Sequence, residues 1–125
     1  MILDTNALSA VADANPVVRE KIAGATGPYL PVIVIGEYRF GLLSSRERLR
    51  RLPWLEALLS SWIVLDVTRE TAVYYSELRR WLQEHSRPIP VNDMWIAALA
   101  RQHTVPVLTN DTHFAGIPDV DVVGF

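Results

Sequence analysis

Four acidic residues stand where a carboxylate could do chemistry. Asp4 directly follows the apolar run at the start of the chain, and Asp111 comes three residues after a later apolar run. Glu37 lies within a predicted helix, and Asp93 lies in the first turn of another. Carboxylates that converge without basic partners repel one another, and such a cluster persists most readily around a hard cation such as Mg²⁺ or Mn²⁺. The pattern therefore predicts a metal site that could hold a phosphodiester.

Most of these acids also have a simpler interpretation in terms of helix starts. Asp4, Thr5 or Asn6 could accept hydrogen bonds from the free N–H groups at the start of the next helix. Asn92 could cap a later helix, whose dipole Asp93 would then complement. For a single acid both interpretations stay open, and the repetition of acids at similar positions is what favours the metal site.

Glu37 is unusual because the helix predicted around it is largely apolar. Ile33 and either Phe40 or Gly41 share its face at helical spacing, so we expect its side chain to point inward. Charged residues are seldom buried without a partner. Asp66 likewise lies near the end of a predicted strand, but no Thr-Asn pair comes after it, so we predict that Asp66 lies outside the site.

The surrounding elements alternate between strands and helices. The predicted strands and helices are, in order, strand 1–3, helices 8–14 and 16–24, strand 29–30, helices 32–43 and 46–62, strand 63–67, helices 68–85 and 91–100, and strands 105–108 and 120–123. No hairpin signal joins the strands, which favours a mainly parallel α/β sheet covered on both faces, in a single domain of residues 1–125. Ligands of such sheets bind outside the carboxyl ends of the strands, where Asp4 and Asp111 are expected.

Composition narrows the class of protein further. The chain has 125 residues, half of them apolar, and no cysteine, so neither a disulfide framework nor a thiolate zinc site is available. Its formal net charge is −2, although its basic residues are eleven Arg and a single Lys. Arg favours bidentate phosphate contacts. No basic signal region or membrane-length apolar run is present, and we expect a cytoplasmic protein without a membrane segment.

Several residues have two interpretations that the sequence leaves open. The run at 46–51 is rich in Arg and could be a solvated face or could contact phosphate. Within it Arg46 and Arg48, together with Arg39, are candidates for binding the phosphates of a substrate. His113 could touch substrate, but a loop histidine beside Phe114 is more often structural or merely exposed.

We expect the four Trp side chains to lie in the core or at an interface. None of them lies in an interleaved basic and aromatic run of the kind that stacks nucleic-acid bases. They are Trp54, Trp62, Trp81 and Trp95.

The motifs that contain these acids resemble a known family. They are Leu3-Asp4-Thr5-Asn6, Gly36-Glu37-Tyr38-Arg39-Phe40-Gly41, Asn92-Asp93 with Ile96-Ala97-Ala98, and Leu108-Thr109-Asn110-Asp111 with His113-Phe114. In this order they resemble the PIN-domain ribonucleases of the VapC type, the toxin half of toxin–antitoxin pairs. The resemblance covers the whole chain. It implies a three-layer α/β/α sandwich with a mainly parallel sheet.

The resemblance also implies a function and a set of roles. It implies a Mg²⁺- or Mn²⁺-dependent endoribonuclease in which Asp4, Glu37, Asp93 and Asp111 are catalytic and metal-binding residues. Supporting positions fall on Thr5, Asn6, Asn92 and Thr109, which would orient the carboxylates. The implied partners are an RNA substrate, a cognate antitoxin protein and a second copy of the chain in a homodimer.

Two other classes remain as alternatives. A catalytically silent PIN-like module would bind a partner only, but such relatives usually lose acids that this chain has kept. An Asp-dependent phosphotransfer protein would also place Asp4 at a strand end. The phosphatase pattern requires a second Asp at the position of Asn6. A response-regulator receiver requires a Lys after a late strand, but the only Lys of this chain is Lys21, in an early helix.

Overall fold

The computed structural model describes all 125 residues and contains one sheet of five short parallel strands. The strands are β1 (Ile2–Leu3), β2 (Tyr29–Pro31), β3 (Ile63–Leu65), β4 (Val107–Leu108) and β5 (Val122–Val123). Their order across the sheet is β3-β2-β1-β4-β5, and every neighbouring pair is parallel. The mainly parallel sheet expected from the sequence is confirmed, and β1 lies at its centre.

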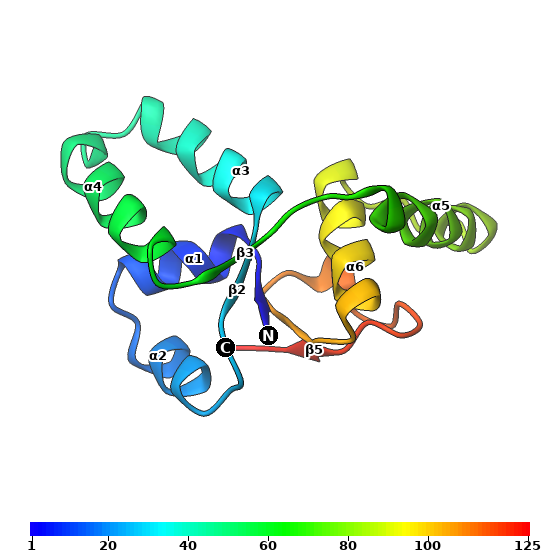
Figure 1. The fold of residues 1–125 in the computed structure, drawn as a ribbon. Helices are drawn as coiled ribbons and strands as arrows, with labels where there is room; N and C mark the ends of the chain where they lie inside the picture. Colours follow the sequence, from blue (N-terminus) through cyan, green and yellow to red (C-terminus); the bar gives the residue numbers. More distant parts are fainter.

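Six α-helices cover the sheet. They are α1 (Thr5–Ala12), α2 (Pro16–Ala23), α3 (Val32–Leu43), α4 (Arg48–Leu59), α5 (Arg69–Glu84) and α6 (Val91–His103), with a short 3-10 helix η1 (Thr112–Phe114) after β4. Figure 1 shows α5 and α6 on one side of the strands and α1 to α4 on the other. The sheet therefore lies between two helical layers, as the α/β/α prediction requires. No helix is both long and apolar enough to cross a membrane.

The core joins the central strand to α6. Ile2 and Leu3 of β1 are fully buried, and so are Val107 and Leu108 of β4. The sequence of α6 is apolar on nearly every side, which predicts a central helix, and all its residues from 96 to 100 are indeed buried. Burying one Leu or Ile side chain contributes about 1.5–3 kcal/mol, so this packing fixes the start of α6 relative to the ends of β1 and β4.

Two helices begin elsewhere than predicted, for local reasons. α1 begins at Thr5 rather than at residue 8, because Oδ1 of Asp4 accepts a hydrogen bond from the Ala7 N–H at 2.9 Å and caps the helix. α4 begins at Arg48 rather than at Arg46, after a turn in which the Ser45 side chain accepts a bond from the Glu47 N–H at 3.1 Å.

The predicted inward face of α3 is wrong. Val34, Tyr38 and Leu42 form its buried face, whereas Phe40 is 77% exposed. Because α3 is apolar on almost every side, its sequence period cannot select the face that the core will cover. Glu37 lies at the boundary of the buried face, partly exposed, and this position lets it line a cleft rather than enter the core.

The sequence predicts that Thr68 caps α5 and that Ala72, Tyr75, Leu78 and Leu82 form its apolar stripe, and this stripe is partly wrong. Leu78 and Leu82 are buried as expected, but Ala72 is exposed and Thr71 is buried in its place. Thr71 is buried because its hydroxyl donates to Oε1 of Gln102 in α6 at 2.5 Å, which satisfies its polar atom. Thr68 caps α5, as predicted.

Candidate active site

All four acids reach one cleft at the carboxyl end of the sheet. Asp4 follows β1 and Asp111 follows β4, and the pairing of Leu3 with Leu108 in the parallel ladder brings these two strand ends side by side. Asp93 comes from the first turn of α6 and Glu37 from the middle of α3.

The cleft consists of two adjoining hollows. One, of about 340 Å³, is lined by Asp4, Thr5, Asn6, Ser9, Glu37, Asp93 and Asp111. The other, of about 400 Å³, is lined by Glu37, Pro90, Val91, Asn92, Asp93, Asp111 and His113. Three acids line both hollows, so the carboxylates form the ridge between them.

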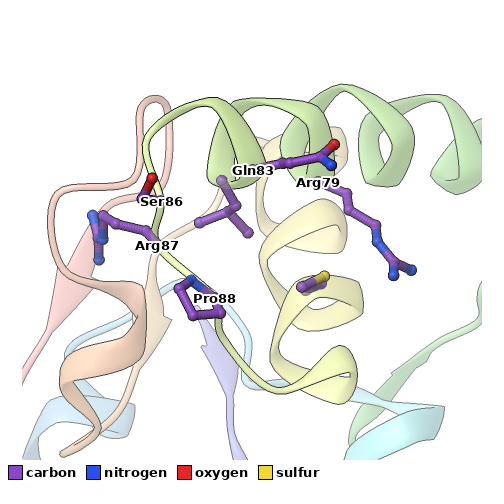
Figure 2. A pocket seen from close by; sticks show the side chains of 7 residues that line it. Arg79, Gln83, Ser86, Arg87 and Pro88 are labelled. Carbon is purple, nitrogen blue, oxygen red and sulfur yellow. The ribbon is translucent and has the colours of Figure 1, made fainter.

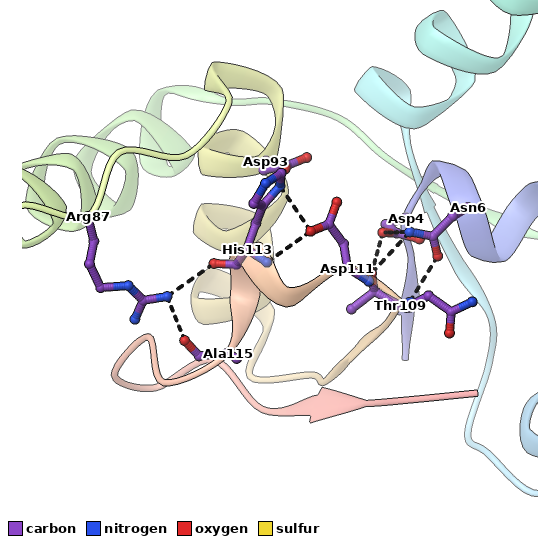
Figure 3. A network of polar contacts seen from close by, with 9 residues as sticks. Asp4, Asn6, Arg87, Asp93, Thr109, Asp111, His113 and Ala115 are labelled. Carbon is purple, nitrogen blue, oxygen red and sulfur yellow. Dashed lines mark hydrogen bonds and ion pairs between the residues drawn. The ribbon is translucent and has the colours of Figure 1, made fainter.

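Asp4 is the deepest of the acids, with 5% of its surface exposed, and it is held by three donors. Oδ1 accepts from the Ala7 N–H, and Oδ2 accepts from Nδ2 of Asn6 at 2.9 Å and from the hydroxyl of Thr109. Figure 3 shows these contacts between the ends of β1 and β4. Asp4 is therefore both a helix cap and a cleft residue, and the two interpretations do not exclude each other.

Thr109 and Asn6 organise the strand end around Asp4. The Thr109 hydroxyl donates to Asp4 and accepts from the Asp111 N–H at 2.8 Å and from Asn6 at 3.4 Å, which uses its one donor and both acceptor positions. Oδ1 of Asn6 accepts from the Asn110 N–H at 3.0 Å. These bonds fix where the Asp111 side chain starts.

His113 stands between Asp93 and Asp111. Its Nδ1 lies 2.7 Å from Oδ2 of Asp93 and 3.0 Å from Oδ1 of Asp111. The Asp111 carboxylate also accepts from the His113 N–H at 2.9 Å, which caps η1. The structure thus places His113 in the cleft, a position that no helical or strand period in the sequence could have indicated.

Glu37 has a buried oxygen without a partner. Its Oε1 accepts no hydrogen bond, and neither does the buried hydroxyl oxygen of Thr5 nearby. A buried carboxylate oxygen left unpaired is costly, and native structures keep such atoms mainly where a ligand or ion will meet them. Asn92 is exposed and does not cap α6, whose first residue follows Pro90 without a side-chain cap.

Burial raises the pKa of three of the acids. The pKa of Asp4 is raised by burial first and further by the charges of Asp93 and Asp111, although its hydrogen bonds to Thr109 and Ala7 act in the opposite direction. The pKa of Asp4 responds to Asp93 and Asp111 because like charges at short range disfavour the ionised form of each carboxylate.

The same causes act on the other two acids. Burial raises the pKa of Glu37, the charge of Asp93 adds to this, and the side chains of Thr5 and Asn92 offset part of it. Burial also raises the pKa of Asp93, against the opposing contact with His113.

The donor set fits a divalent cation. Asp93, Asp111 and His113 each offer one ligand atom, and these atoms lie within 4.8 Å of one another. Carboxylate oxygens suit Mg²⁺, Ca²⁺ and Mn²⁺, and the unpaired oxygen of Glu37 adds a further donor on the same ridge. The acids can therefore hold a divalent metal, whose charge would offset their mutual repulsion.

The arginines named from the sequence lie away from these hollows. Arg39 forms an exposed ion pair with Glu56 at 2.7 Å, and neither Arg46 nor Arg48 lines either hollow. Asp66 is exposed and is likewise absent from the lining, as predicted.

A basic residue near the cleft was not singled out from the sequence. Nη2 of Arg87 donates to the carbonyl oxygen of Ala115 at 2.7 Å and to that of His113 at 3.5 Å. Figure 3 shows Arg87 reaching the segment that carries His113. The rigid Pro-rich connector around Arg87 was visible in the sequence, but nothing there indicated where its side chain would reach.

The fold and the acids define a recognised class of domain. A PIN-domain model matches residues 1–120, and the chain belongs to the PIN-domain family. The family expected from the sequence motifs is therefore confirmed.

Curated relatives carry ribonuclease and toxin names. The chain is 35% identical to Ribonuclease VapC5 of Mycobacterium tuberculosis over 69% of this chain and 65% of that protein. It is 32% identical to Ribonuclease VapC4 of the same organism over 74% of this chain and 72% of that protein. Toxin FitB of Neisseria gonorrhoeae is 28% identical over 98% of this chain and 95% of that protein. The matched segment thus spans just under two thirds of the first of these relatives.

Solved structures agree over nearly the whole chain. VapBC2 from Rickettsia felis, bound to a promoter DNA fragment, superposes with a TM-score of 0.87 and 25% identity, over 99% of this chain and 97% of that chain. FitAcB from Neisseria gonorrhoeae gives a TM-score of 0.79 and 27% identity, over 97% of this chain and 94% of that chain. The α/β/α arrangement is that of these proteins.

Proposed function

We propose that this chain is a divalent-metal-dependent endoribonuclease that hydrolyses RNA phosphodiester bonds and is the toxin of a toxin–antitoxin pair. The observation that carries the proposal is the convergence of Asp4, Glu37, Asp93 and Asp111 on one cleft of a PIN domain. The names of the ribonuclease VapC relatives support the choice of RNA as substrate.

The four acids have two kinds of role in this proposal. Asp4 and Asp93 would hold the metal, and Glu37 and Asp111 would complete the site or help to hold a second ion. Mg²⁺ or Mn²⁺ bound there would stabilise the charge on the phosphate and supply a nucleophile from water. Thr109 and Asn6 orient Asp4 through its Oδ2, so that its carboxylate keeps one direction whether or not a ligand is bound.

His113 has a positioning role in this proposal. Its Nδ1 bridges Asp93 and Asp111, and this contact holds the two carboxylates at a short separation before any cation arrives. Arg39, Arg46 and Arg48 remain predicted substrate contacts that nothing in the structure supports directly.

Two protein partners follow from the relatives. The VapBC2 and FitAcB structures are of toxin–antitoxin complexes, and by analogy this chain would bind a cognate antitoxin over its acidic cleft.

The homodimer stays a prediction. Phe40, Leu43 and Leu49 are more than 60% exposed, which is unusual for large apolar side chains unless a partner covers them. Light scattering that shows only monomer at micromolar concentration would contradict it.

RNA cleavage by the purified protein tests the function. Incubation of RNA with Mg²⁺ or Mn²⁺ should give discrete fragments, EDTA should abolish them, and Ca²⁺ alone should not restore them. Asp4→Asn should remove the activity, whereas Asp66→Asn, at an exposed strand-end acid outside the cleft, should retain it. Equal cleavage by both variants would indicate a contaminating nuclease and overturn the proposal.

The two alternatives predict different results in the same preparation. A silent partner-binding module would cleave no RNA in any divalent metal. A phosphotransfer protein would form an acyl phosphate on Asp4, which acyl-phosphate trapping would reveal. The presence of all four acids in one cleft favours the nuclease over both.

A further inference from the structure

A separate hollow of about 350 Å³ lies between the end of α5, the connector after it and the start of α6. Its polar lining comes from Arg79, Gln83, Ser86 and Arg87, and Met94 of α6 contributes to its apolar part. Figure 2 shows the two arginines at opposite ends of this hollow, with Pro88 between them. We call it the connector hollow.

The connector hollow carries positive charge that no acidic residue neutralises. No acidic residue lines it, and neither Arg79 nor Arg87 forms an ion pair. The other arginines of α3 to α5 that face acids are paired, for example Arg39 with Glu56 and Arg80 with Glu84. Arg79 instead donates to the hydroxyl of Tyr75 at 2.6 Å, which leaves its charge unneutralised.

The guanidinium of Arg87 is held in place. Its Nη2 donates hydrogen bonds to the carbonyl oxygens of Ala115 and His113. Its central carbon, Cζ, lies 5.9 Å from the centre of the Trp81 ring. Trp81 in turn stacks on His85 with ring centres 4.1 Å apart. Trp81 packs against the core, as expected from the sequence, and it also contacts Arg87 because the residues after the helix fold back beside it.

The connector hollow adjoins the acidic cleft along one stretch of chain. Ser86, Arg87 and Pro88 line the connector hollow, and residues 90–92 line the acidic cleft. Arg87 and Asn92 are five residues apart, which is at most about 18 Å even when the chain is extended. Met94 and Asp93 are adjacent in α6, and each of them lines one of the two hollows.

We infer that the connector hollow binds a backbone phosphate of the RNA strand whose scissile bond lies in the acidic cleft. The inference rests on the proposed function. The acids repel the polyanion, so a strand needs cationic contacts beside them, and a fixed Arg presents donors that match phosphate geometry. Because Nη2 of Arg87 is occupied by carbonyl oxygens, its other N–H groups remain for the phosphate.

Binding of a fluorescein-labelled single-stranded RNA, measured by anisotropy in EDTA, tests the inference without cleavage. Ser86→Asp and Ser86→Asn form a matched pair, because Ser86 has φ +51° and both replacements tolerate that conformation. They differ by one charge in the hollow. We expect Ser86→Asp to weaken RNA binding about tenfold, as one charge-assisted contact would, and Ser86→Asn to leave it unchanged.

A second variant addresses the cation itself. Arg79→Gln should lower the slope of log affinity against log salt by about 0.7, the value for one phosphate contact of a single strand. Arg19→Gln, at an exposed arginine of α2 that forms no ion pair, is the control and should leave the affinity at a given salt nearly unchanged.

The outcomes separate this inference from the proposed function. Equal RNA binding by Ser86→Asp and Ser86→Asn, in a protein that still cleaves RNA with Mg²⁺ or Mn²⁺, would overturn the inference alone. That result would also be expected if the hollow took an antitoxin carboxylate instead. Wild-type protein that cleaves no RNA with any divalent metal would overturn the function first.

Discussion

The hydroxyl of Thr109 donates a hydrogen bond to Oδ2 of Asp4 across 105 residues of sequence. The bond joins the ends of the two neighbouring strands β1 and β4, and Thr109 is 2% exposed. Because the same hydroxyl accepts from the Asp111 N–H, one side chain sets the positions of two of the acids. The geometry of the cleft thus depends on a residue that touches no substrate.

Replacing that residue should therefore cost stability. Thr109→Val keeps the shape but removes one donor from a buried carboxylate and one acceptor from a backbone N–H. We expect the free energy of unfolding at pH 7 to fall by about 1–3 kcal/mol, measured by urea denaturation. Thr26→Val, at an exposed loop position, should change it by less than about 0.5 kcal/mol. A loss equally small for Thr109→Val would show that the bond is not important for folding.

Metal binding should separate a true site from a set of helix caps. Asp93→Asn removes one of the repelling charges, so the metal-free variant should be as stable as the wild type or more stable. A metal that binds only the folded state raises stability by about 2.7 kcal/mol at a hundredfold excess over Kd. The wild type should gain this in Mn²⁺ or Mg²⁺, and Asp93→Asn should lose most of the gain, as measured by thermal melting in EDTA and in metal.

The control for that experiment is Asp66→Asn, which should respond to metal as the wild type does, because Asp66 lies outside the cleft. Equal metal shifts in wild type and Asp93→Asn would remove Asp93 from the site. No shift in either protein would remove the metal site itself.

The sequence predicted the acids better than the side chains that hold them. Asp4 and Asp111 could be placed together because parallel strands end at the same edge of a sheet, and Asp93 because an almost wholly apolar helix must lie centrally. The face of α3 could not be predicted, because the helix is apolar on almost every side and only the neighbouring elements decide whether Tyr38 or Phe40 is covered.

Residues outside regular elements were hardest to place. His113 lies in η1 and Arg87 in the connector, where no period relates a side chain to a direction. Their roles depend on how residues 86–90 and 112–116 pack against each other, which is a property of the whole fold. Only the contact of Arg87 with the carbonyl oxygens of His113 and Ala115 shows that the two segments meet.

The products of RNA cleavage should report the nucleophile. Water as the attacking group leaves 5′-phosphate and 3′-hydroxyl ends, whereas the ribose 2′-hydroxyl leaves 2′,3′-cyclic phosphates. We expect the first, because the carboxylates of the cleft are suited to a cation that would activate water. Sequencing of fragment ends, with ligation that requires a 5′-phosphate, measures this. Cyclic phosphate ends would contradict the proposed chemistry and would also identify the cleavage site.

The metal-free protein should become less stable as pH rises from about 4 toward 7, so far as the cleft acids contribute. The folded state raises the pKa of Asp4, Glu37 and Asp93, chiefly by burial. At a pH above about 4, the ordinary pKa of these side chains, the folded protein therefore binds more protons than the unfolded chain. The free energy of unfolding that these three acids contribute is fully present below their pKa values in the unfolded chain. It is lost as the pH rises through their higher pKa values in the folded protein.

Asp93→Asn should flatten that dependence, because it removes one titrating group and lowers the charge that raises the pKa of Asp4 and Glu37. Urea denaturation in EDTA at pH 5, 6 and 7 measures the free energy of unfolding for wild type, Asp93→Asn and Asp66→Asn. The difference between wild type and Asp93→Asn should change with pH, while the difference between wild type and Asp66→Asn should stay constant. Saturating Mn²⁺ should reverse the trend in the wild type, since bound carboxylates must be deprotonated. Parallel curves for all three proteins in EDTA would show that these acids do not share one cleft in solution.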